Sequence, residues 1–275
     1  HPESISSALI EDERVRKITF TGSTEVGKKL VRLSATNLAR VSLELGGQAP
    51  FIVFDDADLE SAVSGLLASK FQVNGQSCLC ANRVFVQNGV QEDFTELLKG
   101  AVKKLRVGPG SDQTTDIGPL IDERGYEKVA NHVADALANG AQIECGGKRS
   151  TEDGFETGFF FEPTILSHCT DNMLCASEET FGPLIPLLSF GSEDEVVERS
   201  NQTPYGLAAY LYTSDLGRAT RTAERLEFGI VGVNDAMPAS PTAPFGGFKE
   251  SGLGREGGRD GLSAFMEAKL ISVMT

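Results

Sequence analysis

Cys78 lies where a thiol could act as a nucleophile. It follows Gly75, Gln76 and Ser77 in a polar segment between a predicted helix that ends near residue 71 and a predicted strand that begins at residue 83. A cysteine on such a turn is exposed enough to react, whereas a single cysteine is otherwise most often a small buried residue. Since no histidine is near it in sequence, backbone N–H groups, a carboxylate base or a bound cofactor would have to activate the thiol.

Glu44 is a candidate general base. It lies between Leu43 and Leu45 in an apolar strand, immediately before Gly46 and Gly47. A carboxylate is expensive to bury there unless it is paired or functional, so we expect its pKa to be raised toward neutrality. The alternative is an outward-pointing residue of an edge strand.

The segment 22–27, with the sequence Gly-Ser-Thr-Glu-Val-Gly, could bind an anion. It lies where a predicted strand ends and a helix begins, so its backbone N–H groups and the helix dipole could hold a pyrophosphate. Alternatively, Ser23 or Thr24 only caps the helix and the glycines serve the turn.

The elements that must position these residues alternate between strands and helices. Apolar runs and period-two patterns predict strands at 15–20, 41–45, 51–54, near 143, and at 184–190, 207–213 and 229–234. Helical periodicity and capping residues predict helices that begin within 22–27 and run to about 34, through 71 after an Asp58 cap, and at 91–105, 123–139, 192–201 and 216–226. This alternation predicts an α/β fold.

The first 45 residues contain too few strands for a doubly wound sheet, which normally has five or six. Either this segment adds its strands to the sheet of the later part, or the chain is the C-terminal portion of a longer protein.

Composition excludes several classes of function. The chain of 275 residues has 25 Lys plus Arg against 39 Asp plus Glu, so a nucleic-acid partner is not expected. No apolar run approaches the roughly 18 residues that span a bilayer, and residues 1–4 do not resemble a signal peptide. Five scattered cysteines and three histidines predict no disulfide framework and no metal site. We therefore expect a cytoplasmic protein without a membrane partner.

Five segments, taken together and in order, carry a resemblance to a known family. They are 20–27, 43–47, 75–78, 178–183 and 244–249, and Glu44 and Cys78 are 34 residues apart. The chain resembles the NAD(P)-dependent aldehyde dehydrogenase superfamily across nearly its whole length. The resemblance implies a partial Rossmann-type cofactor domain at 1–46, an α/β catalytic domain at 47–250, and a C-terminal return with an oligomerisation strand at 251–275.

The resemblance also implies a role for each site residue. Cys78 would attack the aldehyde, and Glu44 would activate water to hydrolyse the resulting thioester. The residues that would contact NAD or NADP are Gly22, Ser23 and Gly27 along the pyrophosphate, Leu45, Glu179 at a ribose hydroxyl, and Phe181 at the nicotinamide. Glu256 would stand behind the catalytic pair. The family's N-terminal part, which carries an oxyanion-hole Asn and a residue that separates NAD from NADP, has no counterpart here.

The succinate-semialdehyde dehydrogenase branch is the most similar, which implies a small aldehyde with a distal carboxylate as substrate. Gln72 stands where some of that branch have a carboxylate-binding Arg. The position where the branch has a Ser is Ala239 here, and Ser240 is next to it. Phe245 resembles the aromatic wall of the substrate tunnel. Cys80 resembles the second cysteine of a redox pair. A homo-oligomer, either a dimer or a tetramer, is expected. A cofactor-free cysteine thioesterase or esterase and a catalytically inactive fragment are the alternatives.

Overall fold

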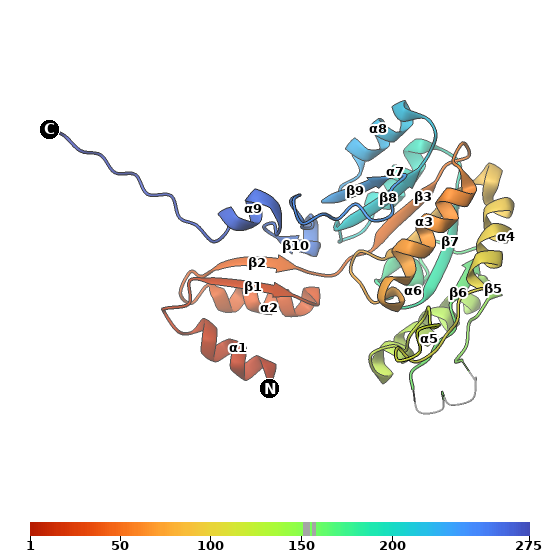
Figure 1. Cartoon of the computed structure of the whole chain (residues 1–275), viewed down its shortest axis with the longest axis horizontal. Helices are drawn as coiled ribbons and strands as arrows, with labels where there is room; N and C mark the ends of the chain where they lie inside the picture. Colours follow the sequence, from red (N-terminus) through yellow and green to blue (C-terminus); the bar gives the residue numbers. More distant parts are fainter. Residues whose placement is uncertain (151–154, 156–157) are drawn as a thin grey trace. The chain divides into compact units, whose positions relative to one another are not determined.

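The structure is a computed structural model that describes residues 1–150, 155 and 158–275 (Figure 1). The chain divides into two compact units. Residues 1–46 and 239–275 form the first unit, and residues 47–238 form the second.

The first unit contains a sheet of three strands in the order β1-β2-β10. Strands β1 (Lys17–Thr21) and β2 (Arg40–Glu44) are parallel, and β10 (Gly252–Leu253) pairs with β2 in the antiparallel sense. Helix α2 (Thr24–Ser34) connects β1 to β2, and α1 (Pro2–Ile10) and α9 (Gly258–Ser263) complete the unit. The parallel pair needs this helical crossover because a short turn cannot reverse the chain twice.

The second unit is built on a sheet of seven strands in the order β5-β6-β7-β4-β3-β8-β9. Each neighbouring pair is parallel except β5 with β6. The strands are β3 (Ala49–Val53), β4 (Ala81–Gln87), β5 (Gln142–Cys145), β6 (Thr164–Ser167), β7 (Leu184–Phe190), β8 (Ala208–Tyr212) and β9 (Ile230–Val233). An α/β fold with a largely parallel sheet is thus confirmed.

Helices cover both faces of this sheet. Phe51 and Val53 of β3 belong to one apolar cluster with α3 (Leu59–Phe71) and α4 (Gln91–Val102). Ile52 points to the other face, toward the cluster that includes α5 (Glu123–Ala138), α7 (Glu193–Asn201) and α8 (Leu216–Arg225). Because successive side chains of a strand alternate in direction, a strand covered on both faces is a continuous apolar run.

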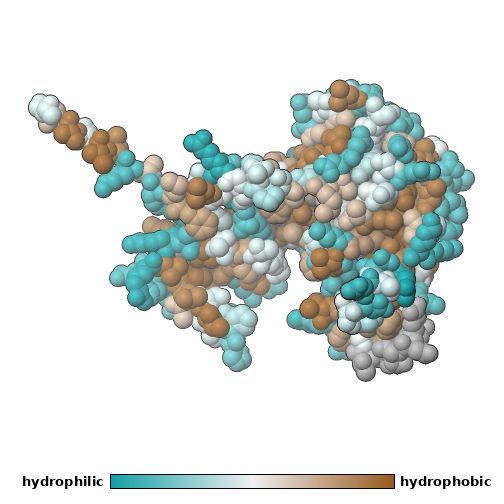
Figure 2. Space-filling model, in the orientation of Figure 1, coloured by the Kyte–Doolittle hydropathy of each residue, from teal (hydrophilic) through white to brown (hydrophobic). Residues whose placement is uncertain are grey.

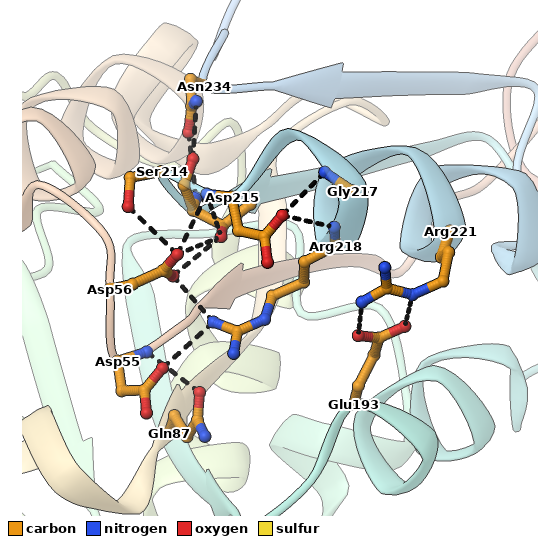
Figure 3. A network of polar contacts seen from close by, with 11 residues as sticks. Asp55, Asp56, Gln87, Glu193, Ser214, Asp215, Gly217, Arg218, Arg221 and Asn234 are labelled. Atoms are coloured by element: carbon orange, nitrogen blue, oxygen red, sulfur yellow. Dashed lines mark hydrogen bonds and ion pairs between the residues drawn. The ribbon is translucent and has the colours of Figure 1, made fainter.

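A polar network fastens the end of β3 to the start of α8 (Figure 3). The Asp56 carboxylate accepts hydrogen bonds from the Thr213 hydroxyl at 2.7 Å and from the Ser214 hydroxyl at 3.1 Å, and Arg218 lies 2.8 Å from it. Burial alone would raise the pKa of Asp56, but the hydrogen bonds from Thr213 and Ser214 and the charge of Arg218 outweigh burial and lower it. The ionised carboxylate is therefore the form that this network stabilises.

The structure differs from the sequence predictions in several respects, and β6 and α9 are among the elements that were not predicted. Helix α1 was not predicted, because only Ile10 of that helix is buried and its apolar pattern is weak. The opening strands form their own sheet and do not extend the larger one. Residues 239–250, predicted with the catalytic domain, belong to the first unit, where Phe245 forms a backbone bridge with Glu256 and Glu250 pairs with Lys28 of α2 at 2.7 Å. Residues 267–275 form neither helix nor strand, and the oligomerisation strand expected within 251–275 stays a prediction, since a strand requires a hydrogen-bonded neighbour.

Candidate active site

The turn before Cys78 has an unusual backbone. Within the short helix η1 (Gln72–Gly75), Val73, Asn74 and Gly75 have φ angles of 51°, 58° and 76°. The left-handed region is unfavourable for a β-branched residue such as Val73. Gly75 has a second constraint, because a β-carbon there would overlap the carbonyl of Gly182. Strain of this kind persists only where surrounding contacts impose it.

Two amide side chains impose this conformation. Asn74 donates a hydrogen bond through Nδ2 to the Gly118 carbonyl at 2.7 Å. Gln76 accepts one through Oε1 from the Ile121 N–H at 2.9 Å. The cysteine turn is therefore tied on both sides of Gly75 to the segment 118–121.

Cys78 and Cys80 lie in different environments. Cys78 is half-buried, whereas Cys80 is buried and its thiol contacts the Gln72 carbonyl at 3.6 Å. Burial raises the pKa of the Cys80 thiol. Of the two thiols, that of Cys78 is the more exposed.

Glu44 ends strand β2 and is 2% exposed. Neither of its carboxylate oxygens has a hydrogen-bond partner among the described residues. Burial raises the pKa of Glu44 to about 8, the negative charge of Glu256 adds to the increase, and Arg255 opposes it. The predicted increase in pKa is confirmed, and such a carboxylate can accept a proton near neutral pH.

The first turn of α2 brings together the four residues predicted to contact the pyrophosphate and its surroundings. Ser23 is the N-cap and accepts a hydrogen bond from the Val26 N–H at 3.4 Å. Gly22 donates its N–H to the Glu44 carbonyl at 3.0 Å. Gly27 packs so closely on Leu45 that a β-carbon there would lie 2.6 Å from its side chain. A cavity of about 320 Å³ opens beside Gly27 and Leu45, lined also by Thr24, Val31 and Leu43.

Glu179 and Phe181 lie on the loop between α6 (Leu174–Ser177) and β7. The Glu179 carboxylate accepts a hydrogen bond from the Gly47 N–H at 2.8 Å, and burial raises its pKa. Phe181 has a φ of 56° and is 40% exposed, so its ring is available to a ligand.

The residues predicted to contact substrate fall in different units. Gln72 is exposed at the start of η1 in the second unit. In the first unit, the Ser240 hydroxyl lies 2.9 Å from that of Thr242, and Phe245 forms a backbone bridge with Glu256. The contacts of Gln72 are therefore described within the second unit, and those of Ser240 and Phe245 within the first.

Comparison with known proteins identifies the family. Residues 1–271 match the Aldehyde dehydrogenase family. This chain belongs to the aldehyde dehydrogenase family. It is 51% identical over 270 residues to the NADP⁺-dependent succinate-semialdehyde dehydrogenase GabD of Escherichia coli K12, covering 98% of this chain and 55% of that protein. It is 52% identical over 267 residues to a 3-sulfolactaldehyde dehydrogenase of Pseudomonas putida, covering 97% and 54%.

A solved structure gives the same result for the fold of this aldehyde dehydrogenase chain. An NADP-dependent enzyme of Escherichia coli superposes with a TM-score of 0.94 at 50% identity, covering 97% of this chain and 55% of that one. The chain thus spans about half the length of the relatives that it matches.

Three buried polar residues beside the site of this family member were not assigned a role from the sequence. Lys70 is 1% exposed, and burial lowers its pKa to about 8. Asn82 and His132 are 3% and 1% exposed, and both contact the Glu179 loop. A polar residue inside an apolar stretch was the available signal, but it does not reveal which distant segment such a residue contacts.

Proposed function

We propose that this chain belongs to an enzyme that oxidises an aldehyde to a carboxylic acid with NAD⁺ or NADP⁺. The burial and raised pKa of Glu44 are the main support for the proposal. A buried carboxylate that has no hydrogen-bond partner in the described part of the chain, and whose pKa is about 8, is costly for stability and suited to activating water. Family membership supplies the reaction in which such a base is needed.

The residues present fit a dinucleotide cofactor. The exposed first turn of α2 has backbone N–H groups that the Ser23 cap does not use, and these suit a phosphate. Gly22, Ser23, Gly27 and Leu45 would hold the pyrophosphate side, Glu179 a ribose hydroxyl, and Phe181 the nicotinamide side. When bound, the cofactor supplies the hydride acceptor for the oxidation.

Cys78 and Glu44 would carry the two covalent stages. The Cys78 thiolate attacks the aldehyde carbon and forms a C–S bond, while the Cys78 N–H stabilises the oxygen that becomes negative. Loss of hydride from that carbon leaves a thioester on Cys78. Glu44 then removes a proton from water, the water oxygen attacks the thioester carbon, and the C–S bond breaks to release the acid and the thiolate.

We propose an aldehyde with a distal anionic group as substrate, with succinate semialdehyde the first candidate. Two relatives support this, since their names give substrates with a carboxylate or a sulfonate. Gln72 is exposed and can donate hydrogen bonds to such an anion, but it brings no charge. Ser240 and Phe245 would contribute a hydroxyl and an aromatic wall.

The test is the growth of nicotinamide absorbance in the full-length protein that contains this chain. Succinate semialdehyde, 3-sulfolactaldehyde and uncharged butanal are compared with both NAD⁺ and NADP⁺. We expect activity with a preference for the anionic aldehydes, loss of activity in Cys78→Ala, and retention in Cys145→Ala, a half-buried cysteine distant in sequence. Hydrolysis of a thioester without any dinucleotide requirement, together with no aldehyde oxidation, would instead establish a cofactor-free esterase.

We also propose that the enzyme is a cytoplasmic homo-oligomer. Apolar side chains in the extended C-terminal segment are exposed, including Leu270 at 93%, Ile271 at 72% and Val273 at 78% (Figure 2). An unpaired apolar segment of this kind favours pairing with another copy. Light scattering of the full-length protein should give a dimer or a tetramer, and a monomer would contradict the proposal.

Within the described residues, no helix is both long and apolar enough to cross a membrane.

A further inference from the structure

Asn82 contacts the backbone on both sides of Glu179. Its Nδ2 donates a hydrogen bond to the Glu178 carbonyl at 3.0 Å, and its Oδ1 accepts one from the Thr180 N–H at 2.9 Å. The same Nδ2 lies 3.3 Å from the Cys175 carbonyl. One buried side chain at the start of β4 therefore fixes the backbone that enters and leaves Glu179.

His132 of α5 contacts the side chains on both sides of Glu179. Its Nδ1 lies 3.1 Å from the Thr180 hydroxyl, and its Nε2 lies 3.5 Å from the Glu178 carboxylate. Because a carboxylate only accepts hydrogen bonds, we assign the proton to Nε2 and let Nδ1 accept from the Thr180 hydroxyl. The neutral ring thus makes both contacts.

A third contact fixes the helix that precedes this loop. Gln48 donates a hydrogen bond through Nε2 to the Ala176 carbonyl at 2.7 Å, next to the hydrogen bond from Gly47 to Glu179. Because these contacts come from β4, α5 and the residues before β3, three elements that are distant in sequence hold one short segment.

We propose that Asn82 and His132 are positioning residues that aim the Glu179 carboxylate at the ribose of the dinucleotide. The inference rests on the proposed function, in which Glu179 contacts a ribose hydroxyl. Neither residue needs to touch the cofactor. A hydrogen bond to a ribose is sensitive to small displacements, so holding the neighbours of Glu179 on both sides improves dinucleotide affinity without changing the reaction at Cys78.

The test measures dinucleotide affinity directly, by calorimetric titration of the full-length protein with NAD⁺ and NADP⁺. Asn82→Asp keeps the acceptor for the Thr180 N–H but replaces the donor to the Glu178 carbonyl by a charged acceptor. His132→Gln removes at least one of the two ring contacts. We expect each variant to weaken dinucleotide binding about tenfold, by analogy with removal of outer-shell partners at other ligand sites, while KM for the aldehyde and kcat at saturating dinucleotide change little.

A double-mutant cycle separates aiming of Glu179 from general loosening of the fold. In a Glu179→Gln background, Asn82→Asp and His132→Gln should cause no further loss of affinity. An equal loss in both backgrounds would overturn the inference. Thr222→Val is the matched control, since Thr222 is a buried threonine of α8 whose hydroxyl has no hydrogen-bond partner among the residues that the structure describes, and it should leave affinity unchanged.

Thr180 provides a second route if either variant fails to fold. Thr180→Val removes the hydroxyl that His132 accepts from, and Thr180→Ser restores it. We expect affinity to fall with valine and to recover with serine. If the Thr180→Val and His132→Gln single variants both retained the dinucleotide affinity of the parent, the inference would be overturned. Absence of dinucleotide binding in the parent protein would instead overturn the proposed function.

The pH dependence of binding gives an independent readout. Burial lowers the pKa of His132, Lys128 on the same helix lowers it further, and Glu178 and Asp135 oppose these effects. The ring is therefore neutral at and above its ordinary pKa of about 6.5 and becomes protonated only below it. Once protonated, Nδ1 can only donate, so the Thr180 hydroxyl must turn to accept from it, and we expect this rearrangement beside Glu179 to lower dinucleotide affinity on acidification. This fall should be smaller in His132→Gln than in the parent.

Discussion

Gly47 lies directly against the backbone carbonyl of Cys78, so that a β-carbon on residue 47 would overlap the Cys78 oxygen. The same glycine donates its N–H to Glu179 at 2.8 Å. One residue without a side chain therefore contacts both the nucleophile's backbone and the carboxylate assigned to the cofactor.

Gly47→Ala should damage activity more than stability. The added methyl group must push the Cys78 carbonyl away, and displacing a reacting group by about 1 Å costs about 100-fold in rate. The accompanying loss of stability should be about 1–3 kcal/mol, as for other overpacked sites. Steady-state kinetics and thermal unfolding of the full-length protein measure the two effects.

Gly100→Ala is the matched control. Gly100 lies within α4, and a β-carbon there would meet no heavy atom within 4 Å. Because alanine favours a helix over glycine by about 1 kcal/mol, this variant should be as active and at least as stable as the parent. Equal activity of Gly47→Ala and Gly100→Ala would show that the contact with Cys78 has no functional importance.

Glu44→Gln should slow hydrolysis of the thioester more than its formation, since the carboxylate acts on water after hydride transfer. A pre-steady-state burst of reduced dinucleotide should persist in the variant, while the steady-state rate falls. In the parent, the rate of hydrolysis should rise with pH toward about 8, the pKa of Glu44, and level off above it. Loss of the burst with intact dinucleotide binding would assign Glu44 an earlier role.

Glu44→Gln should also stabilise the fold, with a definite dependence on pH. The pKa of Glu44 is higher in the folded protein than in the unfolded chain, so the unfolded state loses its proton first. The parent therefore loses stability as pH rises from about 4.5 to about 8, and glutamine removes that loss. The gain in unfolding temperature should be larger at pH 8 than at pH 5. An equal gain at both pH values would contradict the assignment.

The sequence predicted much of the local structure because most strands of the larger sheet are apolar runs, whereas β5 is partly polar and β6 was not predicted. The strand predicted at 184–190 is β7 with the same bounds, and Asp58 caps α3 by accepting the Ser61 N–H at 3.1 Å. Strand order was not predicted, since apolar periodicity shows which face is buried and not which strand is the neighbour.

For the candidate site too, the sequence predicted the local features but not the contacts between distant segments. The burial of Glu44 follows from its flanking leucines, and the capping role of Ser23 follows from the segment around it. The positions of Asn82 and His132 against the Glu179 loop depend on packing between β4, α5 and that loop. Both residues contact Thr180, which is 98 residues from Asn82 and 48 residues from His132. No local pattern encodes a contact at such a distance.

Asp56→Asn should lower the free energy of unfolding by about 1–3 kcal/mol, because it weakens several hydrogen bonds to a charged group. The folded pKa of Asp56 is below its ordinary value, so its contribution is present above that value and is lost as pH falls through the folded pKa. Thermal unfolding between neutral and acidic pH should show the two proteins converging on acidification.

Asp55→Asn is the control for Asp56. Asp55 is 47% exposed and pairs with the same Arg218 at 3.0 Å (Figure 3). An exposed ion pair contributes about 0–1 kcal/mol, so this variant should unfold nearly as the parent does. Equal destabilisation by the two substitutions would mean that charge pairing with Arg218, and not the hydroxyl and backbone hydrogen bonds to Asp56, stabilises this corner.

Iodoacetamide should label Cys78 before Cys80, because Cys78 is half-buried whereas Cys80 is 6% exposed and its pKa is raised by burial. Peptide mass analysis after brief labelling of the full-length protein measures the two sites. Preferential labelling of Cys80, or full activity in Cys78→Ala, would contradict the assignment of the nucleophile.

Cys78 and Cys80 should also form a disulfide when the enzyme is treated with peroxide, with two thiols and one peroxide giving a disulfide and two waters. The chain already turns here, since the Cys80 N–H donates to the Ser77 carbonyl at 3.0 Å, but the Cys80 thiol lies against the Gln72 carbonyl and must leave it, and two cysteines with one residue between them close a small ring. The bond should therefore be strained and easily reduced. We expect peroxide to inactivate the parent enzyme and dithiothreitol to restore its activity. Activity of Cys80→Ala should be restored less completely, because the oxidised Cys78 thiol then lacks the second cysteine and proceeds to sulfinic acid. Cys145→Ala should behave as the parent does, and equal recovery in Cys80→Ala would show that Cys80 is only a packing residue.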